Sequence, residues 1–229
     1  MPHIDVEMQK LKDKLLEMWD LVEYQLASGR QAMLENNHEL ANKVVKLGKK
    51  VNRYDIKIDR QCENFFALFT PVAVDLRQVL ATLKINANLE RIGDTAEGIS
   101  RIVTKLKEPL SQELLEESRT LEMYESALLM FTAARKAFIN ADSAGARLVL
   151  KQDKLLNKIY RKSDKVLAGY MRANPDKIEI CLHLYNLIKK LERVGDQITN
   201  IAEEVIFYRD AKVVKHKEKK KKKKDQGEK

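Results

Sequence analysis

The sequence predicts an all-α protein with an elongated shape, built as two tandem three-helix bundles with six long helices. The composition has 8 Gly, 4 Pro and 34% charged residues, which is typical of a helical protein. Apolar residues recur at steps of three and four along most of the chain, which is the period of an amphipathic helix. The phrase LERIGD at 89–94 returns as LERVGD at 191–196, which indicates an internal duplication.

The first three helices are predicted from their apolar spacing and their breaks. A break at Asn36-Asn37 separates the first helix from a second, which is expected to end near Leu68. Thr70-Pro71 is typical of a cap followed by proline at the first helical position of a third helix. That helix is expected to reach Lys107 and to end before Glu108-Pro109. The apolar stripe of the first helix consists of Ile4, Met8, Leu11, Leu15, Met18, Val22 and Leu26.

The second half of the chain repeats this arrangement. A fourth helix is predicted from about Gln112 to Asn140, and a fifth is expected to begin at a cap formed by Asp142 or Ser143. Asn174-Pro175 is expected to cap a sixth helix, as Thr70-Pro71 caps the third. The predicted domains are therefore residues 1–108, residues 109–211 and a Lys-rich tail at 212–229.

The positive charge of the chain is concentrated in that tail, which holds ten Lys and three acidic residues. Because its like charges repel and it has almost no apolar residue to bury, the tail is predicted to be disordered. It is either solvated without a partner or a tether to acidic lipid headgroups or RNA. The nearly neutral remainder argues against a DNA-reading face, so no specific nucleic acid is expected as a partner.

The cellular compartment is predicted from three features that the sequence lacks. The N-terminus has no basic segment followed by an apolar stretch, as a secretory signal would have. No apolar run approaches the roughly 20 residues of a membrane span. Cys62 and Cys181 are far apart and form no metal motif, so they are expected to be buried free thiols. A cytoplasmic protein is therefore expected.

Each copy of the repeated phrase contains two carboxylates four residues apart, Glu90 with Asp94 and Glu192 with Asp196. Residues at this spacing lie on one face of a helix, about 6 Å apart. Such pairs are common on solvated faces, but this one recurs at equivalent places beside apolar residues. Both copies also hold a glycine inside a helix, which favours the close approach of a neighbouring helix.

The helix register brings further ligands to the second copy. With a turn at Asn174, Asp153 and Asn157 lie opposite Asp196 and Glu192 on the antiparallel neighbour. Three carboxylates at such a place repel one another unless they are protonated or bind a metal ion. Oxygen-rich ligand sets suit Mg, Ca or Mn, and carboxylate clusters also bind iron.

The first copy is expected to have a less complete ligand set. Asn52 faces the first motif, but Gly48 occupies the place that Asp153 has in the second unit. Asp55 and Asp59 form a further pair at steps of four, about 7 and 13 Å closer to the turn. A bend of the helix would bring Asp55 to the motif, whereas Asp59 is harder to include.

A carboxylate-bridged metal enzyme is the alternative function class, and the sequence argues against it. Di-iron oxidases built on helical bundles use a Glu-x-x-His pair from each of two helices. Here only His38 follows a Glu by three residues, and it lies at a predicted break between helices. The sequence contains no nucleophile with an adjacent base and no glycine loop for a phosphate. The protein is therefore not expected to be an enzyme.

The sequence resembles the PhoU family of phosphate-uptake regulators over about residues 4–210. The residues that carry the resemblance are the two copies of the repeated phrase and the segment PVAVDLR at 71–77, which is similar to the family signature PxAxDLR. Asn52, Asp55 and Asp59 also match the family pattern along the second helix. Gly48, where an Asp is usual, and the Lys-rich tail depart from it.

The resemblance implies two three-helix bundles whose E(D)xxxD motifs bind metal ions, in some members iron or zinc clusters. It implies a non-enzymatic adaptor between the ATPase subunit of a phosphate ABC transporter and a sensor histidine kinase. Such an adaptor represses the phosphate-starvation response and phosphate uptake when phosphate is plentiful. A homodimer in the cytoplasm is expected, with contact to the inner face of the membrane through the tail. An alternative is a cytosolic regulator of a sodium–phosphate cotransporter.

Overall fold

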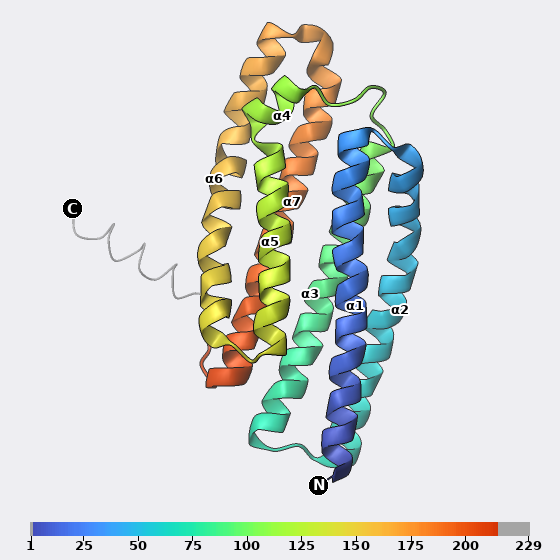
Figure 1. Ribbon diagram of the computed structural model, residues 1–229, viewed down its shortest axis with the longest axis vertical. Coiled ribbons are helices and arrows are strands. Elements are labelled where there is room, and N and C mark those ends of the chain that lie inside the picture. The colour runs from blue at the N-terminus through green and yellow to red at the C-terminus, as the bar shows by residue number, and fades with distance from the viewer. Residues whose placement is uncertain (1, 215–229) are drawn as a thin grey trace, which may run out of the picture.

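The computed structural model describes residues 2–214 and shows two groups of long helices lying side by side in an elongated molecule (Figure 1). No strand occurs among these residues, which confirms the all-α prediction and its two tandem bundles. Predictions for 215–229 lie outside the described residues. The elements are α1 (Pro2–Glu35), α2 (His38–Phe69), α3 (Ala73–Val103), α4 (Gln112–Ser118), α5 (Thr120–Ile139), α6 (Ser143–Ala173), the 3₁₀ turn η1 (Pro175–Lys177) and α7 (Ile178–Asp210).

The two bundles share one hydrophobic core, because their buried apolar side chains form a single continuous cluster. Trp19 of α1 is fully buried at the junction. Its ring centroid lies 5.5 Å from that of Phe131 and 5.8 Å from that of Phe138, both on α5. Such aromatic contacts add to the free energy gained from burying the rings. The helices α1 and α5 therefore hold the bundles together along one side.

Along the other side, α3 and α7 pack antiparallel and follow an approximate twofold symmetry. The Asn200 side-chain nitrogen donates to Asn88 Oδ1 at 3.3 Å. At the other half of the contact, the Lys190 ammonium lies over Gly98, where a Cβ atom would be 2.5 Å from Nζ. With the repeat offset of 102 residues, Asn88 is equivalent to Lys190 and Gly98 is equivalent to Asn200. The duplicated helices therefore meet about a pseudo-twofold axis that brings the two motif copies near the middle.

The prediction of one continuous fourth helix is wrong, because the structure has two helices there. The segment from Gln112 to Asn140 is interrupted at Arg119, whose φ of 55° is left-handed. Ser111 caps the short helix α4 by accepting from the Leu114 amide at 3.2 Å. The Ser118 and Thr120 hydroxyls, both buried, share a hydrogen bond of 2.7 Å across the break. Leu114, on α4 before the break, is buried in the core.

The predicted start of the third helix is also wrong. Thr70 ends α2 in a left-handed conformation with φ of 45°, and α3 begins at Ala73 after an extended Val72. Helix α3 ends at Val103, before the expected Lys107. The Asn174-Pro175 pair opens the 3₁₀ turn η1, and only then does α7 start.

The predicted cap at Asp142 is confirmed, and Asn37 caps α2 after the predicted break. Asn37 accepts from the Leu40 amide at 2.9 Å. Asp142 accepts from the amides of Ala144 and Gly145 at 3.0 Å each. Both side chains therefore satisfy backbone donors that would otherwise be unpaired at a helix start.

Candidate functional site

The first motif lies where α3 meets α2. Glu90 is half-buried and Asp94 is exposed, on the same face of α3. Between them, Gly93 is buried, and a Cβ atom there would lie 3.0 Å from the Val51 side chain of α2 and 3.2 Å from Gln25 Oε1 of α1. The close approach of neighbouring helices that the glycine predicts is therefore confirmed. It places the carboxylates at the rim of the helix contact.

Asn86, which the sequence pattern did not single out, joins the two helices beside this motif. Its side-chain nitrogen donates to Asp55 Oδ1 at 2.8 Å, to Asp59 Oδ1 at 2.9 Å and to the Asp55 carbonyl at 3.0 Å. The side chain is fully buried, and its Oδ1 has no hydrogen-bond partner among the described residues. Asn86 lies four residues before Glu90, so the α2 carboxylates are held beside the motif face.

Burial and neighbouring charges shift the pKa values of these carboxylates. Burial, followed by the charges of Asp94 and Asp55, raises the pKa of Glu90. Burial and the charge of Asp59 raise the pKa of Asp55, and the hydrogen bond from Asn86 opposes them. Asp55 therefore contributes to the raised pKa of Glu90, whereas Asp59 acts on Asp55. Asn52 is exposed one turn away.

A carboxylate from α3 fills the space left by Gly48. The Glu97 side chain lies over this glycine and would collide with any Cβ atom there. Glu97 also accepts from Arg101 at 2.9 and 2.6 Å. In the second unit the carboxylate at this contact is Asp153 of α6. In the first unit it is Glu97, which comes from α3 and not from α2.

In the second unit, Asp153 lies against the second motif, as the helix register predicts. A Cβ atom on Gly195 would be 2.7 Å from Asp153 Oδ1 and equally close to Leu156. Asn157 donates to both the carboxylate and the carbonyl of Asp153. Asp153 therefore reaches across to the residue that precedes Asp196.

The carboxylates of the second motif resemble those of the first in their burial and in the direction of the pKa shift. Glu192 is half-buried and Asp196 exposed. Burial, followed by the charge of Asp196, raises the pKa of Glu192. An offset of 105 residues relates α2 to α6 and places Tyr160 at the position of Asp55. Tyr160 stacks on Tyr185 with ring centroids 6.5 Å apart. The hydrogen bond with Tyr185, then burial, raises the pKa of Tyr160, and Glu192 also contributes.

The donors of both units fit a cation that prefers oxygen. Carboxylates with raised pKa values would be stabilised by a bound positive charge, and the unused Asn86 oxygen adds a neutral donor. Within residues 2–214, however, no three His, Cys, Asp or Glu side chains are grouped closely enough to hold a metal ion. The described carboxylates lie close together only in pairs. Some of their side chains would have to rotate for three of them to contact one metal ion.

Comparisons with known proteins identify the relatives of this chain. The family model for the PhoU domain matches residues 15–103 and 120–205, one match in each bundle. A PhoU homolog of Zymomonas mobilis is 32% identical over 203 residues, covering 89% of this chain and 85% of the relative. The phosphate-specific transport system accessory protein PhoU of Escherichia coli is 29% identical, covering 89% of this chain and 84% of the relative.

Solved structures agree with the sequence comparison. The crystal structure of the phosphate transport system regulatory protein PhoU from Streptococcus pneumoniae has a TM-score of 0.84 and 25% identity, and the match covers 92% of this chain and 99% of that one. PhoU from Pseudomonas aeruginosa has a TM-score of 0.82 and 28% identity, with 91% and 99% covered. These proteins are named as accessory or regulatory proteins and not as enzymes, as predicted. The chain belongs to the PhoU family.

Proposed function

We propose that this protein is an accessory protein of a phosphate-specific transport system and a negative regulator of phosphate uptake and of the phosphate-starvation response. The observation that carries the proposal is the position of the two motifs. The motifs lie at equivalent places on α3 and α7, the two helices that meet about the pseudo-twofold axis. Each motif adjoins carboxylates of a second helix. The relatives are named as accessory proteins of phosphate-specific transport systems, so phosphate is the proposed transported substrate.

The proposed role is that of an adaptor between the transporter ATPase subunit and a sensor histidine kinase. The described residues form long helices that present extended surfaces, which suits a protein that works by contact. A homodimer would present two copies of the same surface. None of the described helices has an apolar stretch long enough to cross a bilayer. The proposed location is the cytoplasm, at the inner face of the membrane.

Metal ions are proposed to bind at the two motifs. Glu192 and Asp196, with Asp153 and Asn157, would hold an ion in the second unit. Glu90 and Asp94 would do so in the first, with Asn52, Asp55 and Asp59 from α2. A bound cation would supply positive charge that removes the repulsion between the carboxylates, and it would tie α2 to α3 and α6 to α7. The candidate ions are iron, zinc, magnesium, calcium and manganese.

The test of this function is a deletion of the gene. Phosphate uptake and transcription of phosphate-starvation genes are measured in phosphate-rich medium, with the wild-type gene returned as a control. The expected result is that both increase in the deletion strain and fall again on complementation. Unchanged uptake and transcription would contradict the regulatory role.

A further inference from the structure

The side chain of Lys190 brings a positive charge from the second bundle to the first motif. Lys190 lies on α7, and its Nζ is 2.5 Å from the place that a Cβ atom on Gly98 of α3 would take. Gly98 follows Asp94 by four residues, so both lie on one face of α3, about 6 Å apart. Asp94 is exposed and Lys190 is half-buried. The Lys190 ammonium is therefore about one helical turn from the first motif.

The charge of Asp94 acts on Lys190 across this contact. Burial, followed by the charge of Arg193, lowers the pKa of Lys190, and the charge of Asp94 opposes both. The Asp94 carboxylate therefore stabilises the ammonium of Lys190. Because Asp94 is also a proposed metal ligand, the ammonium and a metal ion would be attracted to the same carboxylate. Two cations beside one carboxylate repel each other, and partial burial weakens the screening of that repulsion by water.

The second motif has a neutral side chain at the equivalent place. Asn88 corresponds to Lys190 in the repeat, and Asn200 corresponds to Gly98. The Asn200 side chain donates to Asn88 Oδ1 at 3.3 Å, so two amides meet in this half of the contact. The pseudo-twofold packing of α3 against α7 therefore forms with an amide as well as with an ammonium. Packing alone does not account for the positive charge of Lys190.

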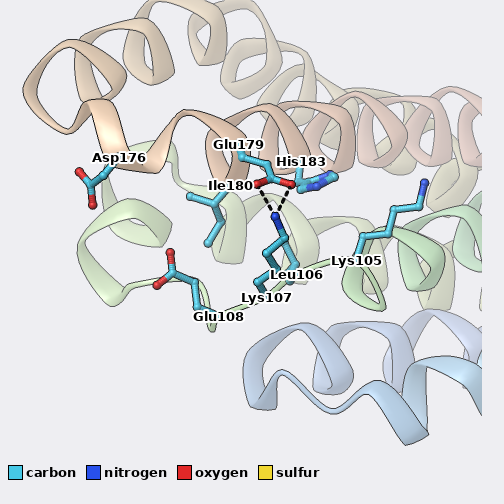
Figure 2. A pocket seen from close by; sticks show the side chains of 8 residues that line it. All are labelled: Lys105, Leu106, Lys107, Glu108, Asp176, Glu179, Ile180 and His183. Carbon is cyan, nitrogen blue, oxygen red and sulfur yellow. Dashed lines mark hydrogen bonds and ion pairs between the residues drawn. The ribbon is translucent and has the colours of Figure 1, made fainter.

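Helix α7 is held next to the first bundle on both sides of Lys190. Near its N-terminus, Glu179 accepts from Lys107 of the segment that follows α3, at 2.8 Å (Figure 2). Near its C-terminus, the buried Glu204 pairs with Lys84 of α3 at 3.2 Å. The backbone of α7 thus lies between two contacts that keep it beside α3. The Lys190 side chain has a flexible stem, so it can swing away from α3 while the helix stays in place.

We propose that Lys190 competes with metal ions for the first motif. Its ammonium weakens the binding of an ion to Glu90 and Asp94, and an ion that binds there displaces the ammonium from α3. This inference rests on the metal binding proposed above and adds a regulation of that site. Because the coupling between two sites is reciprocal, a change that draws Lys190 away from α3 strengthens metal binding at the first motif. Metal occupancy in the first bundle is in this way coupled to a contact that the second bundle makes.

Binding of Mn²⁺ to the purified full-length protein, freed of metal with a chelator, tests the proposal. Electron paramagnetic resonance measures the free Mn²⁺. Each variant is made in an Asp196→Ala parent, which lacks a ligand of the second motif, so that the first motif dominates the binding. Lys190→Gln and Lys190→Met remove the ammonium. The matched control is Lys189→Gln, which removes the exposed ammonium of the preceding residue and changes the net charge equally. Circular dichroism verifies that each variant retains its helices.

Both Lys190 variants should bind Mn²⁺ about tenfold more tightly than the parent, because a repelling charge has been removed. The Lys189→Gln control should bind like the parent. Adding Asp94→Ala to Lys190→Gln should abolish the gain, because the ion then lacks the carboxylate for which the ammonium competes. The proposal is overturned if the Lys190 variants bind no more tightly than the control, or if the gain remains after Asp94 is replaced.

The same titrations separate the competition from the metal binding on which it rests. If the parent binds Mn²⁺ and loss of the Lys190 ammonium leaves the affinity unchanged, the competition is overturned and the metal site stands. If neither the wild type nor any variant binds Mn²⁺, the competition and the binding of this ion at the motifs are both overturned. Binding that emerges only when Lys190 is replaced supports the competition, because the ammonium then excludes the ion from the first motif.

Discussion

The carboxylate of Glu97 on α3 lies over Gly48 on α2, in the space that a side chain at position 48 would take. In the second unit, Asp153 of α6 lies over Gly195 of α7. The glycine is therefore on the earlier helix of the pair in the first unit and on the later helix in the second. Both units thus place a carboxylate at the helix contact next to the motif. The first unit lacks an aspartate at 48 but does not lack a carboxylate.

Replacing Gly48 by Ala tests how firmly Glu97 is held. Alanine in a helix is about 1 kcal/mol more stable than glycine, but its Cβ atom would displace the Glu97 carboxylate. The matched control is Gly169→Ala, because nothing lies within 4 Å of a Cβ atom there. We expect Gly169→Ala to raise the free energy of unfolding by about 1 kcal/mol, and Gly48→Ala by less, in urea denaturation. Equal gains would show that Glu97 moves aside without cost.

Asn86 is expected to be important for stability. Its buried amide donates to two carboxylates, and hydrogen bonds to charged groups contribute about 1.5–3 kcal/mol. Asn86→Ala should therefore lower the free energy of unfolding by about 2–4 kcal/mol at neutral pH. Asp55→Ala alone, and together with Asn86→Ala, completes a double-mutant cycle. Strictly additive losses would contradict the coupling that the hydrogen bonds predict.

The raised pKa of Glu192 predicts a stability that depends on pH. Because the folded-state pKa lies above the unfolded value, the charged form disfavours folding, and stability falls as pH rises through this range. In the metal-free protein, Glu192→Gln should therefore be up to about 1 kcal/mol more stable than the wild type at pH 7. The difference should disappear below about pH 4, where the glutamate is protonated in both states.

Glu179 provides a control of opposite sign. A hydrogen bond from Lys107, followed by its charge, lowers the pKa of Glu179, so ionisation there favours the folded state. Glu179→Gln should not stabilise the protein at pH 7. Thermal unfolding of the two variants across pH checks both signs. With metal removed from both proteins, a Glu192→Gln variant that is less stable than the wild type at pH 7 would contradict the electrostatic repulsion inferred at the second motif.

The contact between the bundles should depend on Lys84 of α3. Its ammonium lies 3.2 Å from Glu204 of α7, whose side chain is only 2% exposed. Loss of one partner leaves a buried charge poorly compensated, which is costly. Lys84→Met should lower the free energy of unfolding by about 1–3 kcal/mol. Lys107→Met should lower the free energy of unfolding less than Lys84→Met, because its partner Glu179 is 65% exposed.

Periodicity and duplication predicted the long helices, and the glycine of each motif predicted a close contact between helices. The break at Arg119 was not predictable, because a left-handed arginine carries no glycine or proline signal in the sequence. The Thr70-Pro71 pair misled because its pattern is typical of a helix start, whereas here Thr70 ends the preceding helix.

The site was predictable only in part. Carboxylates at steps of four share a face whatever the tertiary structure, so the motif pairs follow from spacing. Asn86 and Glu97 lie on that same helix, at steps of four and seven from Glu90, and this spacing was the signal that could have found them. Their importance comes from contacts with α2, and those depend on how the helices rotate about their axes.

The metal content of the protein, purified without affinity metals and measured by elemental analysis, tests the proposed metal binding at the motifs most directly. The wild type is compared with Asp94→Ala and Asp196→Ala. We predict bound divalent or ferric ions in the wild type and a loss of metal in each variant, because each motif adjoins carboxylates of a second helix. Absence of metal at micromolar free concentrations, or an unchanged metal content in both variants, would contradict this prediction.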